Sequence, residues 1–541
     1  MRQLIECVPN FSEGRDLGII RQLTDEIERV EGVSLLHVDP GKSTNRTVVT
    51  LAGAPDRVTE AAFRAIKLAG QLIDMRRHTG EHPRMGATDV CPLIPIAGIS
   101  MEETARHAVA LARRVGTELG IPVYLYEDAQ TNPARKNLAA IRAGEYEGFF
   151  KKIQDPAWQP DFGPAVFNPH TGATVIGARD FLVAFNLNLN TTSTRRANAI
   201  AFDVREAGRP GLAGTLKAVK AIGWYIDEYG VAQVSMNLTN LAVTPLHVAF
   251  DEVCRAAGQR GIRVTGSELV GLVPLETMLA AGRYFLRKQQ RSLGVSESDL
   301  IHIAVKSLGL DELGPFLPEK RIIEYQLRAT TATKRLIDRS VTGFVNETAS
   351  ESVAPGGGSV AALLGALGAG LGTMVANLSS HKRGWEARWE EFSEWAVRGQ
   401  ALKDELLRLV DEDTQAFNRV MAALGLPKGT SEEQAARAEA LETANRGAIE
   451  VPYRVMEAAF ASFPLLKAMA EHGNPASASD AGVGALCARS AVLGAWLNVR
   501  TNLAGLKDPE AVEAWVRAGE GMAAEVGGLE HEIRVLVDLR I

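Results

Sequence analysis

The chain has 541 residues, 46% of them hydrophobic and 23% charged, and at roughly 100–200 residues per domain this length predicts three or four domains or subdomains. The composition is that of a globular protein and excludes disordered and collagen-like chains. A net charge of −6 provides no basic surface for nucleic acid. The four cysteines are widely separated and show no metal-ligand spacing, and the first residues lack the pattern of a secretory signal peptide. We therefore expect a cytoplasmic protein with free thiols, no metal and no nucleic-acid partner.

The first part of the chain alternates between strand and helix patterns. Strands are predicted at 4–8, 34–38, 46–52 and 123–126, and helices at 16–29, 55–72 and 101–119. A second series begins near Thr174, with strands at 181–189 and 231–238 and helices at 194–206 and 245–259. These two series predict two α/β subdomains, 1–178 and 179–327, joined through the irregular segment 155–172.

The remaining part of the chain has helical patterns throughout. They cover 340–350, 357–380, 385–411, 412–424, 432–446, 450–470, 480–503 and 509–539. We predict an all-α bundle at 340–541, connected by a polar, Thr-rich linker at 328–339. Residues 352–380 contain no charged residue and could mimic a membrane span, but their Gly and Ala content and Asn377 favour a tightly packed buried helix. We expect no membrane association.

Three polar residues of the first part are candidates for chemistry. His82 lies in the polar, irregular segment 77–90, where Pro83 disfavours helix. Its imidazole could move protons near neutrality, or it could be a surface histidine without a role. Asp39 follows a predicted strand and could orient a catalytic imidazole or cap a turn. Asn10 also follows a strand and could contact a substrate or form an Asx turn.

The helical part offers two further candidates. The glycines Gly356, Gly357 and Gly358 stand before a predicted helix, followed by Ser359. Their N–H groups could gather around an anion, or the segment could be a plain loop with Ser359 near the helix start. Asp413 shares a helix face with Phe417. If that face meets the core, the pKa of the carboxyl group rises and Asp413 could act as a base or acid; the alternative is a solvated acidic cap.

Longer segments resemble known families. ECVPNFSEGRD (6–16), VDPGKSTNRTVVT (38–50), GEHPRMGATDVCPLIPI (80–96) and FGPAVFNPHTGATVIGARDFLVAFNLNL (162–189) resemble glutamate formimidoyltransferase. VAPGGGSVAALLGALGAGLG (353–372), LVDEDTQAFNRVMAALGLPK (409–428) and ALCARSAVLGAWLNVRTNL (485–503) are similar to formimidoyltetrahydrofolate cyclodeaminase. Their order and the total length resemble the bifunctional formimidoyltransferase-cyclodeaminase family over essentially the whole chain.

The resemblance implies two successive reactions of histidine degradation. The formimino group of N-formimino-L-glutamate is moved to N5 of tetrahydrofolate, the co-substrate, with or without a polyglutamate tail. The 5-formiminotetrahydrofolate is then cyclised to 5,10-methenyltetrahydrofolate, and ammonia is released. The family's transferase has two α/β subdomains with folate between them, and its cyclodeaminase is all-helical and forms dimers. The resemblance therefore also implies a homo-oligomer, either a dimer or an assembly of dimers.

The resemblance also assigns roles to residues. His82 matches the catalytic base, Asp39 the residue that stabilises its imidazolium or holds its tautomer, and Asp413 the proton acceptor of the cyclodeaminase. Asn10 and Gly356–Ser359 are expected to bind substrate, and His170 could contact substrate or cap its loop. The expected folate-binding residues are Gly163, Pro164, Ala165, Val166, Phe167, Asn168, Pro169, His170, Thr171 and Gly172.

Two alternatives remain open at this point. The chain could be a formyltransferase that uses N-formylglutamate, since the two donors differ only by NH and O at one carbon. It could also be a folate-binding scaffold with a vestigial second activity. The intact residues His82 and Asp413 favour an active enzyme over a scaffold.

Overall fold

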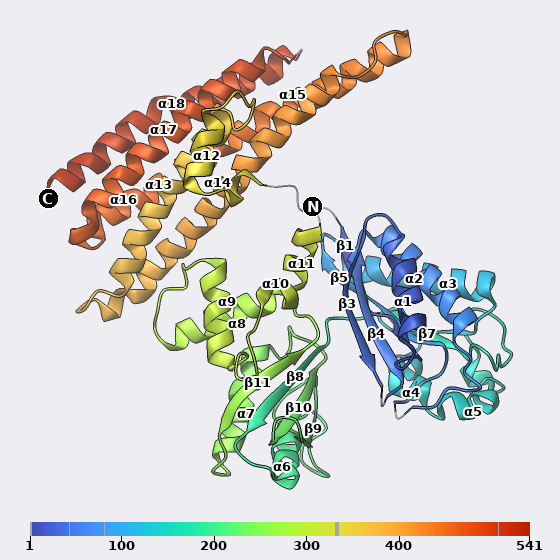
Figure 1. The fold of residues 1–541 in the computed structure, drawn as a ribbon. Helices are drawn as coiled ribbons and strands as arrows, with labels where there is room; N and C mark the ends of the chain where they lie inside the picture. Colours follow the sequence, from blue (N-terminus) through green and yellow to red (C-terminus); the bar gives the residue numbers. More distant parts are fainter. Residues whose placement is uncertain (1–2, 43, 81, 331–334, 507) are drawn as a thin grey trace. The chain divides into compact units, whose positions relative to one another are not determined.

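A computed structural model describes residues 3–42, 44–80, 82–330, 335–506 and 508–541. Residues 331–334 of the predicted linker 328–339 lie outside the described residues. The chain divides into two compact units, one formed by 1–281 with 305–331 and the other by 282–304 with 332–541. The first contains two β-sheets with helices and the second is helical (Figure 1), which confirms the predicted fold class.

The first sheet has seven strands in the order β1-β4-β2-β5-β7-β6, and β3 pairs with β4. The strands are β1 Leu4–Cys7, β2 Asn10–Phe11, β3 Val33–Gly41, β4 Arg46–Gly53, β5 Thr88–Ala97, β6 Val123–Glu127 and β7 Thr174–Ala178. β5, β7 and β6 are parallel, and the other pairings are antiparallel. The sheet therefore combines a parallel part with an antiparallel part that contains the predicted site segments.

Helices cover one face of this sheet. They are α1 Leu17–Glu28, α2 Pro55–Leu72 and α3 Met101–Leu119. Ile5, Cys7 and Leu93 belong to the hydrophobic core beneath these helices. Cys7 and Cys91 are 84 positions apart in the sequence, yet their Sγ atoms lie 3.4 Å apart on neighbouring strands, both as free thiols. The opposite face is partly covered by α4 Leu138–Arg142 and α5 Glu145–Lys152, which pack on residues of β5, β6 and β7.

The second sheet is antiparallel, with the order β11-β8-β10-β9. Its strands are β8 Val183–Leu189, β9 Val219–Ile226, β10 Val231–Leu238 and β11 Val264–Val270. The helices of this part of the chain are α6 Thr194–Val204, α7 Leu246–Gly258, α8 Leu275–Lys288, α9 Glu297–Leu308, α10 Pro318–Arg321 and α11 Ile323–Thr330. The strand predicted at 231–238 is confirmed, and that predicted at 181–189 begins two residues later.

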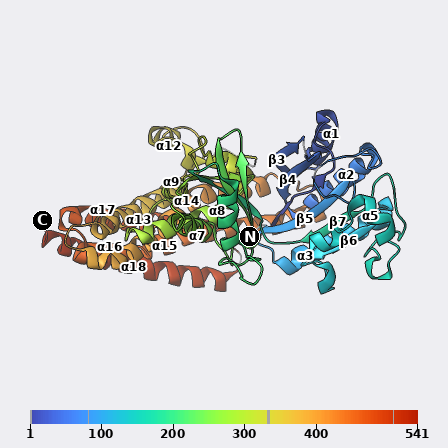
Figure 2. The same ribbon diagram turned by 90° about the horizontal axis from the view of Figure 1, so that it is seen from below.

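The helical unit consists of helices that pack against one another, five long ones and the shorter α12 and α16 (Figure 2). They are α12 Val341–Thr348, α13 Gly357–Ser380, α14 Trp389–Leu424, α15 Ser431–Phe460, α16 Phe463–His472, α17 Ala478–Leu503 and α18 Pro509–Asp538. The prediction of separate helices at 385–411 and 412–424 was wrong, because α14 is continuous. The break predicted between 446 and 450 was also wrong: α15 continues to Phe460.

The continuity of α15 through Pro452 has a physical explanation. A proline inside a helix has no N–H, so the carbonyl four residues earlier loses its helical donor. Here that carbonyl belongs to Ala448, and the side-chain amide of Asn502 on α17 donates to it at 2.7 Å. The replacement hydrogen bond comes from a residue 54 positions away, which no local sequence pattern reveals.

Two features of the helical unit bear on earlier expectations. α13 and the stretch Pro475–Leu503 are long and apolar enough to cross a bilayer, but 61% and 50% of their most apolar windows are buried inside the protein. Burial of this kind is what the core helices of a folded bundle show. In addition, Gly294 joins this unit: its carbonyl accepts from Asn377 Nδ2 at 2.8 Å and from Gln400 Nε2 at 3.2 Å.

Candidate active sites

A buried ion cluster lies between β2, β4, β5 and α4. Asp89 is fully buried, and both Arg46 and Arg142 donate hydrogen bonds to its carboxylate. Burial alone would raise the pKa of Asp89, but the two guanidinium charges outweigh burial and hold the pKa below its usual value. Arg46 Nε also donates to Asn10 Oδ1 at 3.1 Å. The cluster therefore fixes Asn10 and two positive charges in one place.

His82 lies within the field of this cluster. Burial lowers the pKa of its imidazole, and the charges of Arg46 and Arg142 lower it further. His82 Nδ1 lies 2.7 Å from the carbonyl oxygen of Pro83. A carbonyl can only accept, so in this bond Nδ1 carries the proton and Nε2 keeps its lone pair. The arrangement provides a neutral imidazole at neutral pH whose Nε2 can take a proton from a substrate.

Asp39 is exposed on β3 and does not contact His82 among the described residues; its charge acts instead on His37, where it opposes the lowering of the pKa by burial. The tautomer of His82 is held by the Pro83 carbonyl, and the nearby carboxylate is Asp89. The role expected for Asp39 therefore stays a prediction, whereas Asn10 and His82 are brought together through Arg46.

The segment 163–172 is a structured loop. Asn168 Oδ1 accepts from the N–H groups of His170 and Thr171 at 3.0 and 3.2 Å, so Asn168 is the residue that caps the loop. His170 Nδ1 lies 3.4 Å from Asp74 Oδ1. The ring of Phe167 packs against those of Tyr146, Phe149 and Phe150, while residues 163–166 are exposed. The exposed half of the loop is free to meet a ligand.

The structure brings this loop beside the segment that carries His82. Ala87 N donates to Thr171 O at 2.8 Å, and Ala173 N donates to Met85 O at 3.1 Å. Helix α5 holds both segments: Tyr146 N donates to Arg84 O at 2.9 Å, and Tyr146 Oη donates to Pro169 O at 2.6 Å. Hydrogen bonds thus join the described parts of two segments that were predicted separately, 77–90 and 163–172.

In the helical unit, Asp413 on α14 faces the first turn of α13. Its Oδ2 lies 2.9 Å from Ser359 Oγ, and the backbone N–H of Ser359 also bonds the carboxylate. Burial raises the pKa of Asp413, and the bonds from Ser359 oppose this shift without cancelling it. The net rise supports the interpretation of Asp413 as a core-facing carboxylate that can exchange protons.

The glycines before α13 allow this approach. α13 begins at Gly357 with Gly356 as its N-cap, so Ser359 lies inside the first turn. A Cβ on residue 358 would lie 2.2 Å from Asp413 Oδ1, which only glycine avoids. The sequence pattern led us to expect an anion-binding position at this helix start. The carboxylate of Asp413 fills part of that position.

Sequence reasoning missed several residues of both sites. Arg46, Asp89 and Arg142 were not singled out, although charged residues that flank apolar β-rich runs could have been flagged as a buried pair. Asn498 on α17 was also missed: its side-chain amide lies against Gly357, with Nδ2 3.2 Å from the position of an added Cβ, and donates to Gly494 O at 2.9 Å. No local pattern connects α17 with the start of α13.

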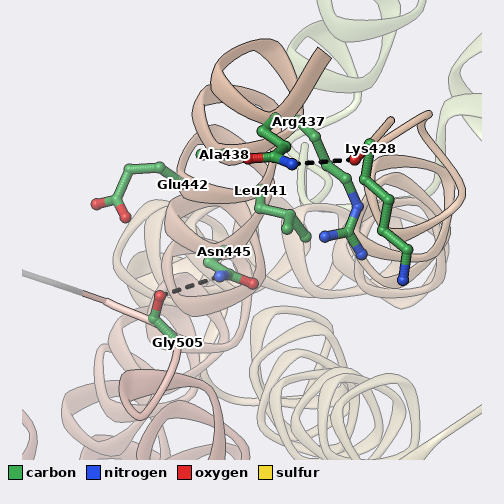
Figure 3. A pocket seen from close by; sticks show the side chains of 8 residues that line it. Lys428, Arg437, Ala438, Leu441, Glu442, Asn445 and Gly505 are labelled. Atoms are coloured by element: carbon green, nitrogen blue, oxygen red, sulfur yellow. Dashed lines mark hydrogen bonds between the residues drawn. The ribbon is translucent and has the colours of Figure 1, made fainter. Parts of the chain in front are cut away.

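A separate hollow of about 380 Å³ lies at the turn between α14 and α15 (Figure 3). Its lining consists of Lys428, Gln434, Arg437, Ala438, Leu441, Glu442, Asn445 and Gly505. Gln434 donates to the carbonyl of Lys428 at 3.1 Å and Asn445 to that of Gly505 at 3.0 Å. These amides hold the turns together, and none of the expected site residues lines the hollow, so we do not assign the chemistry to it. The described residues contain no group of three His, Cys, Asp or Glu side chains suited to a metal ion.

Family models match nearly the whole chain. The formiminotransferase domain, N-terminal subdomain, matches residues 4–179, and the formiminotransferase domain matches residues 184–328. A model described as formiminotransferase-cyclodeaminase matches residues 340–519. The first sheet with His82 lies in the first match, and Asp413 lies in the last.

Individual relatives agree with these matches. The formimidoyltransferase-cyclodeaminase of Gallus gallus is 46% identical over 94% of this chain and 94% of its own length. The glutamate formimidoyltransferase of Streptococcus pyogenes is 42% identical over 53% of this chain and 94% of its own length. The methenyltetrahydrofolate cyclohydrolase of Methylorubrum extorquens is 35% identical over 38% of this chain and 98% of its own length. The chain belongs to the formimidoyltransferase-cyclodeaminase family.

Proposed function

We propose that this chain is a bifunctional folate enzyme of histidine degradation that transfers the formimino group from N-formimino-L-glutamate to tetrahydrofolate and then cyclises the product. One observation carries the proposal. Each unit holds its own proton-handling group, His82 in one and Asp413 in the other, and each group is tuned toward exchange by its surroundings. The family of the chain provides the identity of the substrates.

In the transfer, the N5 amine of tetrahydrofolate attacks the amidine carbon of formiminoglutamate. N5 must lose a proton and the departing glutamate amine must gain one. Nε2 of the neutral His82 ring can take the first proton and return it to the leaving amine. The fixed charges of Arg46 and Arg142 keep the ring neutral before the proton arrives. The aromatic rings of Phe167 and Tyr146 support the loop that would hold folate.

In the cyclisation, N10 attacks the carbon of the formimino group, which carries an extra proton as an amidinium; N10 gives up its proton, and the formimino nitrogen, once it has gained that proton, leaves as ammonia while the cationic methenyl bridge forms. Asp413 can accept the N10 proton and pass it to the departing nitrogen. Burial favours its neutral form and thereby eases the uptake of that proton, whereas the bonds from Ser359 favour the carboxylate. A group balanced in this way can act in both directions within one turnover.

A product assay with formiminoglutamate and tetrahydrofolate tests the proposal. We expect the wild-type chain to form 5,10-methenyltetrahydrofolate and ammonia. His82→Ala should form neither folate product, because the attacking amine keeps its proton. Asp413→Asn should accumulate 5-formiminotetrahydrofolate. Turnover of N-formylglutamate in place of formiminoglutamate would assign the chain to formyl transfer, and tetrahydrofolate binding without turnover of either donor would support the scaffold.

The pH dependence of the transfer tests the electrostatics around His82. Arg142→Gln removes a positive charge that disfavours the imidazolium, so the pKa of His82 should rise. The acid limb of kcat/KM for transfer should move to higher pH by about half to one unit. Arg106→Gln, a surface arginine paired with Glu102, is the control and should leave the profile in place. If the acid limb of kcat/KM stays in place in Arg142→Gln, a group other than His82 is responsible for that limb, and the assignment of His82 as the base is wrong.

The close approach of Gly358 and Asp413 yields a prediction for the second step. Gly358→Ala places a methyl group against the carboxylate and should lower cyclodeaminase turnover about 100-fold, the cost of a misplacement of about 1 Å. Transfer should remain. Gly370→Ala lies on the same helix, where an added Cβ meets nothing within 4 Å, and should retain both activities. The two rates are measured separately, with 5-formiminotetrahydrofolate supplied directly for the second; full cyclodeaminase turnover in Gly358→Ala would contradict the assignment.

We also propose that the chain forms a homo-oligomer through its helical unit. α13 and α17 leave large apolar side chains exposed, among them Leu367 (54%), Val483 (50%) and Leu497 (61%). The many small residues of α13 suit close contact between helices. Sedimentation velocity should show a dimer or a multiple of a dimer, and Leu497→Glu should shift the distribution toward smaller species. A folded and fully active monomer would remove this proposal.

A further inference from the structure

The first strand contains a buried carboxylate that the mechanism above does not use. Glu6 on β1 is 5% exposed. Among the described residues it accepts no hydrogen bond and forms no ion pair, and its carboxylate oxygens keep a small contact with solvent; the charges of Arg179 and Glu324 act on it from a distance. A buried carboxylate without a partner costs free energy, so native proteins retain one only for a reason. Glu6 therefore requires an explanation outside the packing of this chain.

The strand register places Glu6 on the same face of the sheet as the cluster beside His82. Glu6 pairs with Ala52 and Ile94, and Asn10 pairs with Val48 and Val90. On both neighbouring strands the partners are four residues apart, and side chains alternate between faces with a period of two. Glu6 and Asn10 thus project to one face, while Cys7, next to Glu6, points into the helix-covered core.

Other side chains connect the two positions along this face. Tyr126 interacts electrostatically with Arg46 at one end and hydrogen-bonds Arg179 at the other. Its ring lies over Gly177, where an added Cβ would be 2.4 Å from the ring. At about 3.3 Å per residue, Glu6 lies roughly 13 Å from Asn10 along the strand direction. At the Glu6 end this face also carries Ile323 of α11, which packs on Ala52, so a flat ligand that extends from the Asn10 end to Glu6 would lie beside that helix.

We propose that Glu6 binds the pterin ring of the folate co-substrate by accepting hydrogen bonds from its 2-amino group and the adjacent ring N–H. This inference rests on the proposed function. The two donors lie side by side on one edge of the ring and match the two oxygens of a carboxylate. The reacting N5 lies on the opposite side of the bicyclic ring, which would place it toward His82. Glu6 acts here as a specificity-determining residue and not as a proton carrier.

The amidine of formiminoglutamate also presents paired N–H groups and could in principle bind Glu6. The place that the amidine must take during transfer argues against this alternative. Its carbon is the reacting atom and must lie within reach of His82 Nε2, at the other end of this face. The titration of Glu6 agrees with a ligand that supplies donors: burial raises its pKa to about 7, with Arg179 opposing the rise. Donors from a bound pterin would favour the charged carboxylate.

Substitution of Glu6 combined with a modified folate tests the inference. The wild-type chain should bind tetrahydrofolate about 10- to 100-fold more tightly than its 2-desamino-2-methyl analogue, the range expected for charge-assisted hydrogen bonds. Glu6→Gln should lose most of this discrimination and raise the KM for tetrahydrofolate by a similar factor, with a smaller change in kcat and in the KM for formiminoglutamate. Glu6→Asp, which keeps the charge on a shorter side chain, should lie between the two.

Glu530→Gln provides the matched control for a buried carboxylate. Glu530 is 1% exposed but is paired with Arg489 at 2.9 Å and with Arg534, so its loss should lower Tm without affecting tetrahydrofolate discrimination. If Glu6→Gln lowers Tm only, or raises only the KM for formiminoglutamate, the inference is wrong. Should the wild type bind tetrahydrofolate without transferring a group, the proposed function fails, and the binding comparison still decides the role of Glu6. If Glu6→Gln does not fold, the comparison rests on Glu6→Asp.

Discussion

The geometry of the first site depends on the burial of Asp89 between two arginines. A charge without solvent must be paired, and here one carboxylate is shared by Arg46 from β4 and Arg142 from α4. These ion pairs also fix the side chain of Asn10, because Arg46 Nε donates a hydrogen bond to Asn10 Oδ1 at 3.1 Å. Since moving either arginine would leave the buried Asp89 carboxylate with a single cationic partner, the field that acts on His82 is built into the fold. Loss of either partner would therefore affect both stability and the protonation of His82.

Glu6 is the counterpart of Asp89 on the same sheet. Both carboxylates are buried, but the partners of Asp89 belong to the chain, whereas Glu6 has only distant charges. The pKa of Asp89 is held below its usual value and that of Glu6 rises to about 7. A buried charge that is paired within the chain stabilises the fold, whereas an unpaired buried carboxylate is a candidate site for a ligand that supplies the missing donors. The two residues thus separate the support of the site from the surface that meets a ligand.

The periodic elements could be predicted from the sequence because burial on one face imposes a local pattern. Helices α2 and α3 were predicted at 55–72 and 101–119, and α13 at 357–380. Elements that depend on distant partners were not recognised. β5 was missed because Pro92 and Pro95 interrupt its pattern, and the continuity of α15 at Pro452 depends on Asn502. In the same way, His82 and Asp413 stood out as titratable residues in unusual settings, while Arg46, Asp89 and Asn498 matter through contacts across the fold.

Burial shifts the pKa values of the two proton-handling groups in opposite directions, so that the difference between them becomes smaller. His82 starts from a pKa of 6.5 and is lowered by burial and neighbouring positive charge, whereas Asp413 starts from 3.8 and is raised by burial. Both shifts weaken the charged form: they make the carboxylate of Asp413 readier to take up a proton, and they keep His82 in the neutral state that accepts the first proton. Because burial penalises charge of either sign, one physical effect serves an imidazole in an α/β unit and a carboxylate in a helical one. The chemistry of each step then decides which residue type is buried, and neighbouring groups limit how far its pKa moves: the Pro83 carbonyl and Asp89 at His82, and the donors of Ser359 at Asp413.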